Sequence, residues 1–90
     1  MIKDKEILRQ ECDEIIHALN SLKDDDGVPK NVKIKIEIII SDLKEDTDVS
    51  TKVSKSLHNL DEVSEDLNLP SFIRTQIYTI SSMLEKLNSQ

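Results

Sequence analysis

Aromatic residues are almost absent from this chain. Phe72 and Tyr78 are the only two aromatic side chains among its 90 residues. Proteins that bind single-stranded nucleic acid by stacking bases need aromatic side chains arranged along a groove, and the sequence has no such set. The core must therefore be built from aliphatic residues, chiefly isoleucine, leucine and valine.

Cysteine, glycine and proline are equally scarce. The single cysteine, Cys12, excludes a framework of intrachain disulfides. One glycine and two prolines leave few places for tight turns. The composition thus favours a few long elements of secondary structure over many short ones.

Long apolar runs and an excess of positive charge are also missing. No stretch approaches the roughly 20 apolar residues of a membrane span, and the charged N-terminus lacks the apolar core of a signal peptide. The net charge of −6 argues against a general nucleic-acid coat or binding to an anionic membrane, since both require a positive face. We therefore expect a cytoplasmic protein that does not bind membranes.

The composition that remains is that of a globular protein. The chain is 37% hydrophobic and 33% charged, a balance unlike that of disordered proteins. Ninety residues are enough for one modest core. We expect a single domain over residues 1–90.

The chain repeats itself at an offset of 41 residues. Eight residues recur identically: His17, Leu19, Asp25, Pro29, Ile36, Ile39, Ser41 and Leu43 return as His58, Leu60, Asp66, Pro70, Ile77, Ile80, Ser82 and Leu84. Such a repeat indicates one supersecondary unit used twice.

Three segments place their apolar residues on one helical stripe. The first, predicted as a helix over about residues 3–25, carries Leu8, Cys12, Ile15, Leu19 and Leu22. The third carries Val49, Val53, Leu57, Leu60, Val63 and Leu67, and Asp48 or Thr47 is suited to cap its start. The fourth carries Ile73, Ile77, Ile80, Leu84 and Leu87.

The second segment is ambiguous when it is considered alone. Its apolar residues alternate with charged ones from Val32 to Ile38, as in a half-buried β-strand rich in β-branched residues. The repeat favours a helix, because Val32, Ile36, Ile39 and Leu43 match the stripe of the fourth segment. We therefore predict a helix here, with a strand as the alternative.

One turn design accounts for the only glycine and both prolines. Gly27 and Asn68 are equivalent in the repeat, and both tolerate the left-handed backbone that often ends a helix. Pro29 and Pro70 would then be the first residues of the next helices. The sequence thus predicts two helical hairpins, at about residues 3–44 and 48–88, joined by an acidic link at about 44–48.

No residue pattern indicates catalysis or a cofactor. The acidic run 24–27 lacks the ligand spacing of a calcium loop. His17 and His58 lie opposite the apolar stripes and are expected on the surface, and Cys12 is expected in the core. We therefore predict no enzyme activity, no metal and no cofactor.

Four basic residues concentrate near the starts of the second and fourth helices: Lys30, Lys33, Lys35 and Arg74. Helix N-termini also expose N–H groups that can bind phosphate. A contact with an anion or with RNA phosphates is one interpretation, but a solvated face is favoured, because the sequence has no glycine-rich phosphate loop.

Ile34 and Ile38 are not explained by the repeat. At about 100° per residue they point away from the apolar stripe of the second helix, and they lie one turn apart. Their equivalents in the second copy are Thr75 and Thr79. The two isoleucines either widen the core face or bind a partner, and Phe72 and Tyr78 are further candidates for an interface.

Two hairpins can close into a bundle or stack in the open. With only two units, closure buries the apolar stripes better than a solenoid, which needs three or more repeats. We predict an all-α fold, an antiparallel up-and-down four-helix bundle, with a two-unit HEAT-like stack as the alternative.

Short runs at residues 19–20, 27–32, 60–64 and 69–78 resemble a small family of uncharacterised archaeal proteins. The more specific parts are Val28-Pro29-Lys30-Asn31 and Leu60-Asp61-Glu62. The resemblance covers nearly the whole chain and implies a compact, all-helical cytosolic protein of archaeal type. It transfers no catalytic residue, because none is established for the family.

The sequence does not establish a biochemical function. We expect a non-catalytic module for protein–protein interaction or a small homo-oligomer. The alternative is an accessory protein of RNA- or ribosome-linked machinery that uses the four basic residues. An enzyme ranks last, because the sequence has no convergent acid, base and nucleophile.

Overall fold

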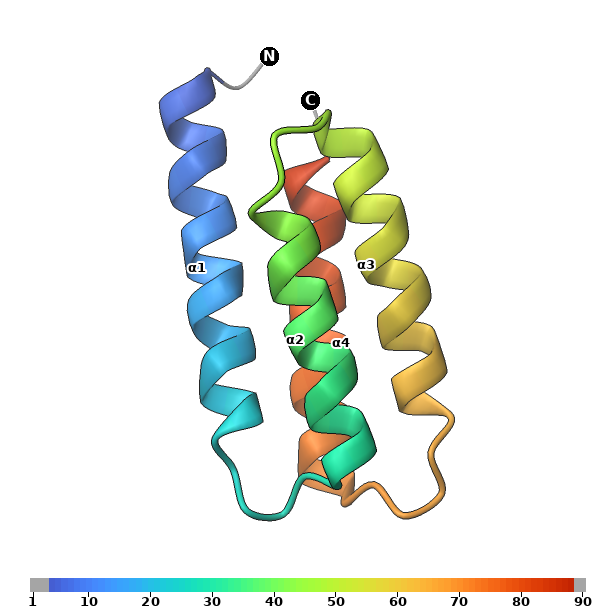
Figure 1. Cartoon of the computed structure of the whole chain (residues 1–90). Helices are drawn as coiled ribbons and strands as arrows, with labels where there is room; N and C mark the ends of the chain where they lie inside the picture. Colours follow the sequence, from blue (N-terminus) through green and yellow to red (C-terminus); the bar gives the residue numbers. More distant parts are fainter. Residues whose placement is uncertain (1–3, 89–90) are drawn as a thin grey trace.

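The chain forms four α-helices, as Figure 1 shows for the computed structural model, which describes residues 4–88. Their bounds are Lys5–Lys23 for α1, Lys30–Leu43 for α2, Val49–Ser64 for α3 and Ser71–Leu87 for α4. No strand occurs in this part of the chain, so the prediction of an all-α protein is confirmed. The residue at which we expected the first helix to begin, Lys3, lies outside the described residues.

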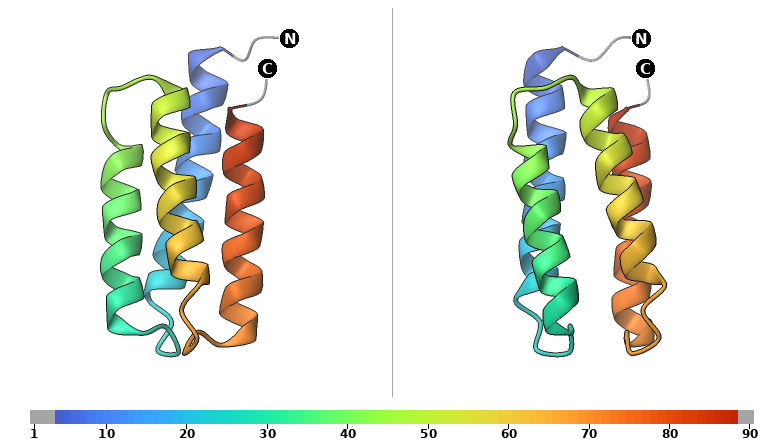
Figure 2. Two further views of the ribbon diagram at one scale, coloured as in Figure 1. Left: turned by 90° about the vertical axis from the view of Figure 1, so that its right-hand side faces the viewer. Right: turned by 45° about the vertical axis from the view of Figure 1, so that its right-hand side comes forward.

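The four helices close into a bundle. Each packs against two neighbours, in the pairs α1–α2, α2–α3, α3–α4 and α1–α4. Across residues 4–88 the diagonal pairs α1–α3 and α2–α4 do not pack against each other. Figure 2 shows the helices side by side with alternating directions. The predicted up-and-down bundle is therefore confirmed, and the HEAT-like stack is not formed.

The second segment is a helix, as the repeat predicted. Its stripe residues Val32, Ile36, Ile39 and Leu43 are fully buried, and Ile40 is buried beside them. The alternating pattern that suggested a strand arises because Ile34 and Ile38 lie on the opposite side of this helix.

The core is aliphatic, and one predicted stripe needs correction. In α3 the buried stripe contains Ser56, whereas Leu57 is only partly buried. Leu67 lies beyond the end of α3 and is 95% exposed, so its assignment to the stripe is wrong. Ser56 is the repeat equivalent of the buried Ile15, and its hydroxyl has no hydrogen-bond partner among the described residues.

The turns inside the two hairpins differ from the prediction. Neither Gly27 nor Asn68 has a positive φ, so the expected left-handed residues are absent from these turns. Instead, the Asp25 carboxylate accepts the N–H of Gly27 at 2.8 Å, and the Asp66 carboxylate accepts that of Asn68 at 2.9 Å. A side-chain oxygen that replaces a backbone acceptor makes a compact turn without left-handed geometry.

The prolines lie one residue earlier than predicted. Pro29 and Pro70 precede α2 and α4 as extended N-cap residues, with φ of −60° and −59°. The carbonyl of Pro29 accepts the N–H groups of Val32 and Lys33 at 3.1 and 3.0 Å. A proline suits this position because its fixed φ is compatible with an extended backbone and no N–H donor is needed there.

Carboxylates cap the other two helices. The Asp48 carboxylate accepts the Thr51 N–H at 3.1 Å, which confirms one of the two predicted caps of α3. Its hydrogen bonds with the Thr51 hydroxyl and N–H lower the pKa of Asp48. Asp4 caps α1 in the same way by accepting the Ile7 N–H at 2.8 Å. Both oxygens satisfy donors that the helix itself leaves free.

Candidate interaction surface

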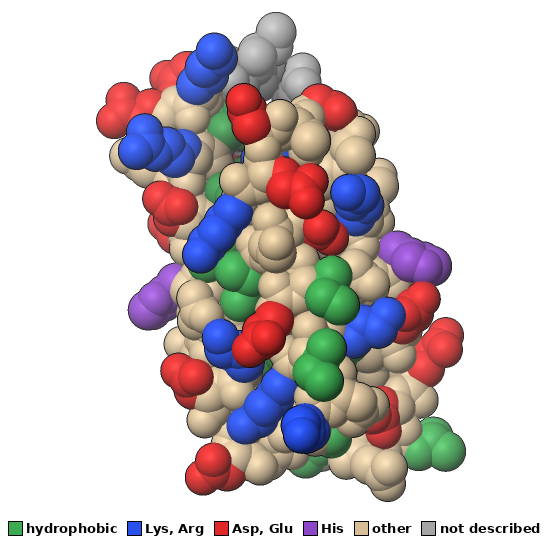
Figure 3. Space-filling model, in the orientation of Figure 1, with side chains coloured by type: hydrophobic (Ala, Val, Ile, Leu, Met, Phe, Trp, Pro, Cys, Tyr) green, Lys and Arg blue, Asp and Glu red, His purple; other side chains and the backbone are tan. Residues whose placement is uncertain are grey.

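The most distinctive surface feature is an apolar patch on the outer side of α2. Ile34 and Ile38 are 52% and 46% exposed, and they lie one helical turn apart. Figure 3 shows apolar side chains over the middle of α2 with Lys and Arg side chains near its lower end. We call the surface formed by Lys30, Ile34, Ile38 and Asp42 the α2 face. The sequence left open whether these isoleucines are buried, and the structure places them on the surface.

A polar seam borders the α2 face on the side of α3. Asn31 donates to the Asp66 carboxylate at 3.1 Å, and the Lys35 ammonium binds the Glu62 carboxylate. The hydrogen bond and charge of Lys35 hold the pKa of Glu62 below its usual value. The pKa of Asp66 is lowered as well, first by the Asn68 N–H and then by Asn31. These carboxylates are therefore fixed as anions in contacts within the chain.

One charge pair borders the α2 face on the side of α1. The Lys23 ammonium lies 3.9 Å from the Glu37 carboxylate. Both side chains are at least partly exposed, so this pair contributes little to stability. Glu37 is nevertheless engaged by this pair. The charged side chains of α2 that have no ion pair within residues 4–88 are therefore Lys30, Lys33 and Asp42.

The four basic residues proposed for an anion site are not all available to bind a ligand. Lys30, Lys33 and Lys35 lie on α2, whereas Arg74 lies on the diagonal helix α4. Lys35 is engaged by Glu62, and Arg74 donates to the backbone carbonyl of Asp66 at 3.0 Å. Only Lys30 and Lys33 remain available to bind a phosphate, whereas the sequence pattern suggested four basic side chains.

The aromatic candidates lie apart from the isoleucines. Phe72 and Tyr78 are 54% and 57% exposed, but both belong to α4, which does not pack against α2. Phe72 lies beside the turn between α1 and α2, since a Cβ placed on Gly27 would be 3.6 Å from its ring. The four proposed interface residues therefore do not form a single surface.

The exposed histidines are as predicted. His17 and His58 lie on the surfaces of α1 and α3, two helices that do not pack together. His58 lies 3.1 Å from the Glu62 carboxylate, one turn along the same helix. Within residues 4–88, no group of three or more His, Cys, Asp or Glu side chains is placed to hold a metal ion.

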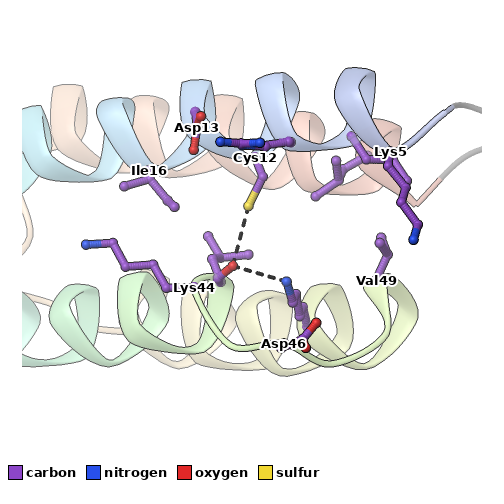
Figure 4. A pocket seen from close by; sticks show the side chains of 12 residues that line it. Lys5, Cys12, Asp13, Ile16, Lys44, Asp46 and Val49 are labelled. Carbon is purple, nitrogen blue, oxygen red and sulfur yellow. Dashed lines mark hydrogen bonds between the residues drawn. The ribbon is translucent and has the colours of Figure 1, made fainter.

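A hollow of about 450 Å³ opens at the end of the bundle where α1 extends past α2. Its lining includes the first half of α1, the link between α2 and α3, and the start of α3. Figure 4 shows Cys12 pointing from α1 across this space toward the link. The sequence did not predict the hollow, because it depends on the difference in length between α1 and α2, 19 and 14 residues.

Two donors meet one carbonyl in this hollow. The Cys12 thiol donates to the Leu43 oxygen at 3.5 Å, and the Lys52 ammonium donates to the same oxygen at 3.3 Å. Together they satisfy the carbonyl at the end of α2, where the helix has no donor of its own. Cys12 is thus packed at the edge of the core rather than fully inside it.

The environment of Cys12 disfavours its thiolate. Burial raises the pKa of the Cys12 thiol, Lys52 acts in the opposite direction, and Asp13 adds to the rise. A nucleophilic cysteine needs the opposite, an exposed and electropositive setting that lowers the pKa. The thiol therefore acts as a neutral hydrogen-bond donor.

Cys12 is expected to react slowly with an aromatic disulfide reagent in the native protein. Because the thiolate is the reacting species and is disfavoured by burial, we expect labelling at least about tenfold slower than in the denatured chain at the same pH. The pH at half-maximal rate should also lie above that of the denatured chain. Stopped-flow absorbance measures both. Equal rates in the two states would show that the thiol is free and exposed.

The lengths and apolarity of the helices bear on membrane insertion. No helix within residues 4–88 is both long and apolar enough to cross a bilayer.

Comparison with known proteins places this architecture in a wider group. The profile of the uncharacterised protein family UPF0147 matches residues 1–87. The chain is 36% identical over 75 residues to a UPF0147 protein of Thermoplasma volcanium, covering 82% of this chain and 84% of that protein. It is 27% identical over 84 residues to one of Archaeoglobus fulgidus, covering 93% and 97% of the two chains.

A solved structure has the same fold. The crystal structure of a UPF0147 protein from Thermoplasma acidophilum superposes with a TM-score of 0.85 at 31% sequence identity. The match covers 92% of this chain and 99% of the other. The archaeal resemblance seen in the sequence is therefore confirmed, and so is the four-helix architecture.

Proposed function

We propose that this chain, which belongs to the uncharacterised protein family UPF0147, is a non-catalytic protein-interaction module of the cytoplasm. It binds its partner through the α2 face. The observation that carries the proposal is the exposure of Ile34 and Ile38 at neighbouring positions of one helix. Exposed apolar area costs about 25 cal/mol per Å², which binding to a partner would recover.

The repeat supports this proposal because its second copy uses polar residues at the same positions. Thr75 and Thr79 replace the two isoleucines in α4, and each hydroxyl donates to a backbone carbonyl four residues earlier, at 3.2 Å. A helix in this bundle thus folds with threonine at these sites. The fold itself does not require isoleucine in α2, which points to a use on the surface.

The geometry also supports a non-catalytic role. The hollow beside α1 contains a thiol whose pKa is raised, and the two histidines lie on the outside of separate helices. Catalysis of the common acid–base or nucleophilic kinds needs an acid, a base and a nucleophile within reach of one point. The RNA-linked alternative has weaker support, since Lys35 and Arg74 are engaged within the chain.

The proposal can be tested by affinity capture with matched variants. The tagged wild-type chain, the double variant Ile34→Thr with Ile38→Thr, and the control Ile7→Thr are incubated with a lysate of the source organism. Ile7 is an exposed isoleucine of α1, so it controls for general surface hydrophobicity.

We expect proteins that are retained by the wild type and by the control, and lost with the double variant. An identical set of proteins for all three baits would contradict the proposal. Capture of nuclease-sensitive RNA at low salt, unaffected by the double variant, would replace it with the RNA-linked alternative.

A further inference from the structure

We propose that the partner of the α2 face is a second copy of this chain, paired so that the two α2 helices run antiparallel about a twofold axis. The inference rests on the proposed function and specifies its partner. It is carried by the distribution of apolar and charged side chains along α2.

The apolar patch is complementary to itself. A twofold axis through the midpoint of Ile34 and Ile38 brings Ile34 of one copy opposite Ile38 of the partner subunit, and the reverse. An interface of this kind closes at two subunits, because each copy uses the same patch. A parallel pairing would also bury the isoleucines, so the charges must decide the orientation.

The charges at the two ends of the patch have opposite signs. Lys30 lies six residues before position 36, the midpoint of the patch, and Asp42 lies six residues after it. At 1.5 Å of rise per residue, each is about 9 Å from the midpoint along the helix. Antiparallel pairing therefore brings Lys30 opposite the partner's Asp42 at both ends. Parallel pairing would bring lysine to lysine and aspartate to aspartate.

These two charges are free to act between copies. Neither Lys30 nor Asp42 forms an ion pair with another of the described residues, 4–88. Of the other charges of α2, Lys35 is engaged with Glu62 and Glu37 with Lys23, whereas Lys33 has no ion pair among the described residues and lies outside the row formed by Lys30, Ile34, Ile38 and Asp42. Complementary charges at the rim of an interface mainly determine its orientation and its partner, which is the role assigned to this pair.

The test is sedimentation equilibrium of the purified chain over a dilution series. We expect the wild type to reach twice the 10.3 kDa mass of one chain at high concentration. The double variant Ile34→Thr with Ile38→Thr should raise the dissociation constant of the dimer at least about 100-fold. The control variant Ile7→Thr should leave it unchanged, and thermal unfolding should show that all variants are folded.

Charge reversal tests the orientation. Lys30→Glu and Asp42→Lys should each weaken dimerisation about tenfold at low salt, since each creates two like-charge contacts. The variant that carries both changes restores opposite charges in the antiparallel arrangement and should return to the wild-type constant. In a parallel dimer each single variant would only exchange one like-charge pair for another. Single variants that do not weaken dimerisation, or a combined variant that does not restore it, would therefore overturn the antiparallel orientation.

The outcomes separate this inference from the proposed function. A chain that remains monomeric, while its α2 face still captures another protein, would end the inference of self-pairing and leave the proposed function in place. A dimer that the double threonine variant does not weaken would refute the inference, and a capture pattern that this variant does not change would refute the proposed function.

Discussion

Leu60→Ala is expected to lower the free energy of unfolding by about 3 kcal/mol, whereas Leu67→Ala should change it by less than about 0.5 kcal/mol. Leu60 is buried in α3, so its truncation removes apolar contacts and leaves a cavity. Leu67 lies in the following turn and is exposed. Urea unfolding followed by circular dichroism, at one chain concentration, measures both values.

The pair is informative because the two leucines belong to the same apolar pattern in the sequence. If both variants lost similar stability, α3 would extend through Leu67 and the turn would be placed wrongly. Unfolding should be compared at equal chain concentration, because self-association would add to the stability of each variant.

Ile15→Ser is expected to be more damaging, with a loss of about 4 kcal/mol. The change removes a buried aliphatic side chain of α1 and places a hydroxyl in the core. A chain of this size has a total stability of about 5–13 kcal/mol, so the variant should approach the unfolding limit. Thermal and urea unfolding measure the loss.

The matched control for this prediction is Ile7→Ser, at an exposed position of the same helix. It repeats the chemical change without the cavity and should be nearly neutral. Equal effects of the two variants would mean that α1 does not bury Ile15 in the core.

The second copy of the repeat has a serine at the position that corresponds to Ile15. Ser56 is the repeat equivalent of Ile15, and it is buried with its hydroxyl unsatisfied within the described part of the chain. A buried hydroxyl without a partner costs about 1–3 kcal/mol. The second hairpin thus has a weaker core position than the first, and its remaining aliphatic residues must compensate for it.

The fold was largely predictable because the repeat supplied information that single segments lacked. The segment from Val32 to Ile38 resembles a strand by itself, and comparison with Ile73 and Ile77 identified it correctly as a helix. The same comparison would have placed Ser56 in the core. Because the side chain of Ser56 is polar, the predicted apolar stripe of the third segment contains Leu57 in its place.

The turns were predicted in the right places but with the wrong geometry. Glycine and asparagine at equivalent positions suggest a left-handed backbone. That prediction depends on backbone preference alone and leaves out hydrogen bonds from nearby side chains. The carboxylates of Asp25 and Asp66, two residues earlier, accept the same N–H groups and remove the need for it. Their recurrence at the repeat offset was the signal that could have revealed this turn.

The candidate surface was predictable only in part. The outward direction of Ile34 and Ile38 follows from helical spacing, and their exposure agrees with it. The separation of Phe72 and Tyr78 from them depends on the diagonal placement of α2 and α4, which is a tertiary property. Lys35 and Arg74 are engaged by Glu62 and by the carbonyl of Asp66, and these contacts follow only from the packed structure.

The packing of α1 against α4 has a consequence for chain connectivity. The start of α1 and the end of α4 lie at the same end of the bundle, near the link between the two hairpins (Figure 1). A circular permutant could therefore be opened in the 44–48 link and joined between α4 and α1. The new order, α3–α4–α1–α2, would keep every helix beside its present neighbours, so two orders of the helices along the chain are compatible with the same packing.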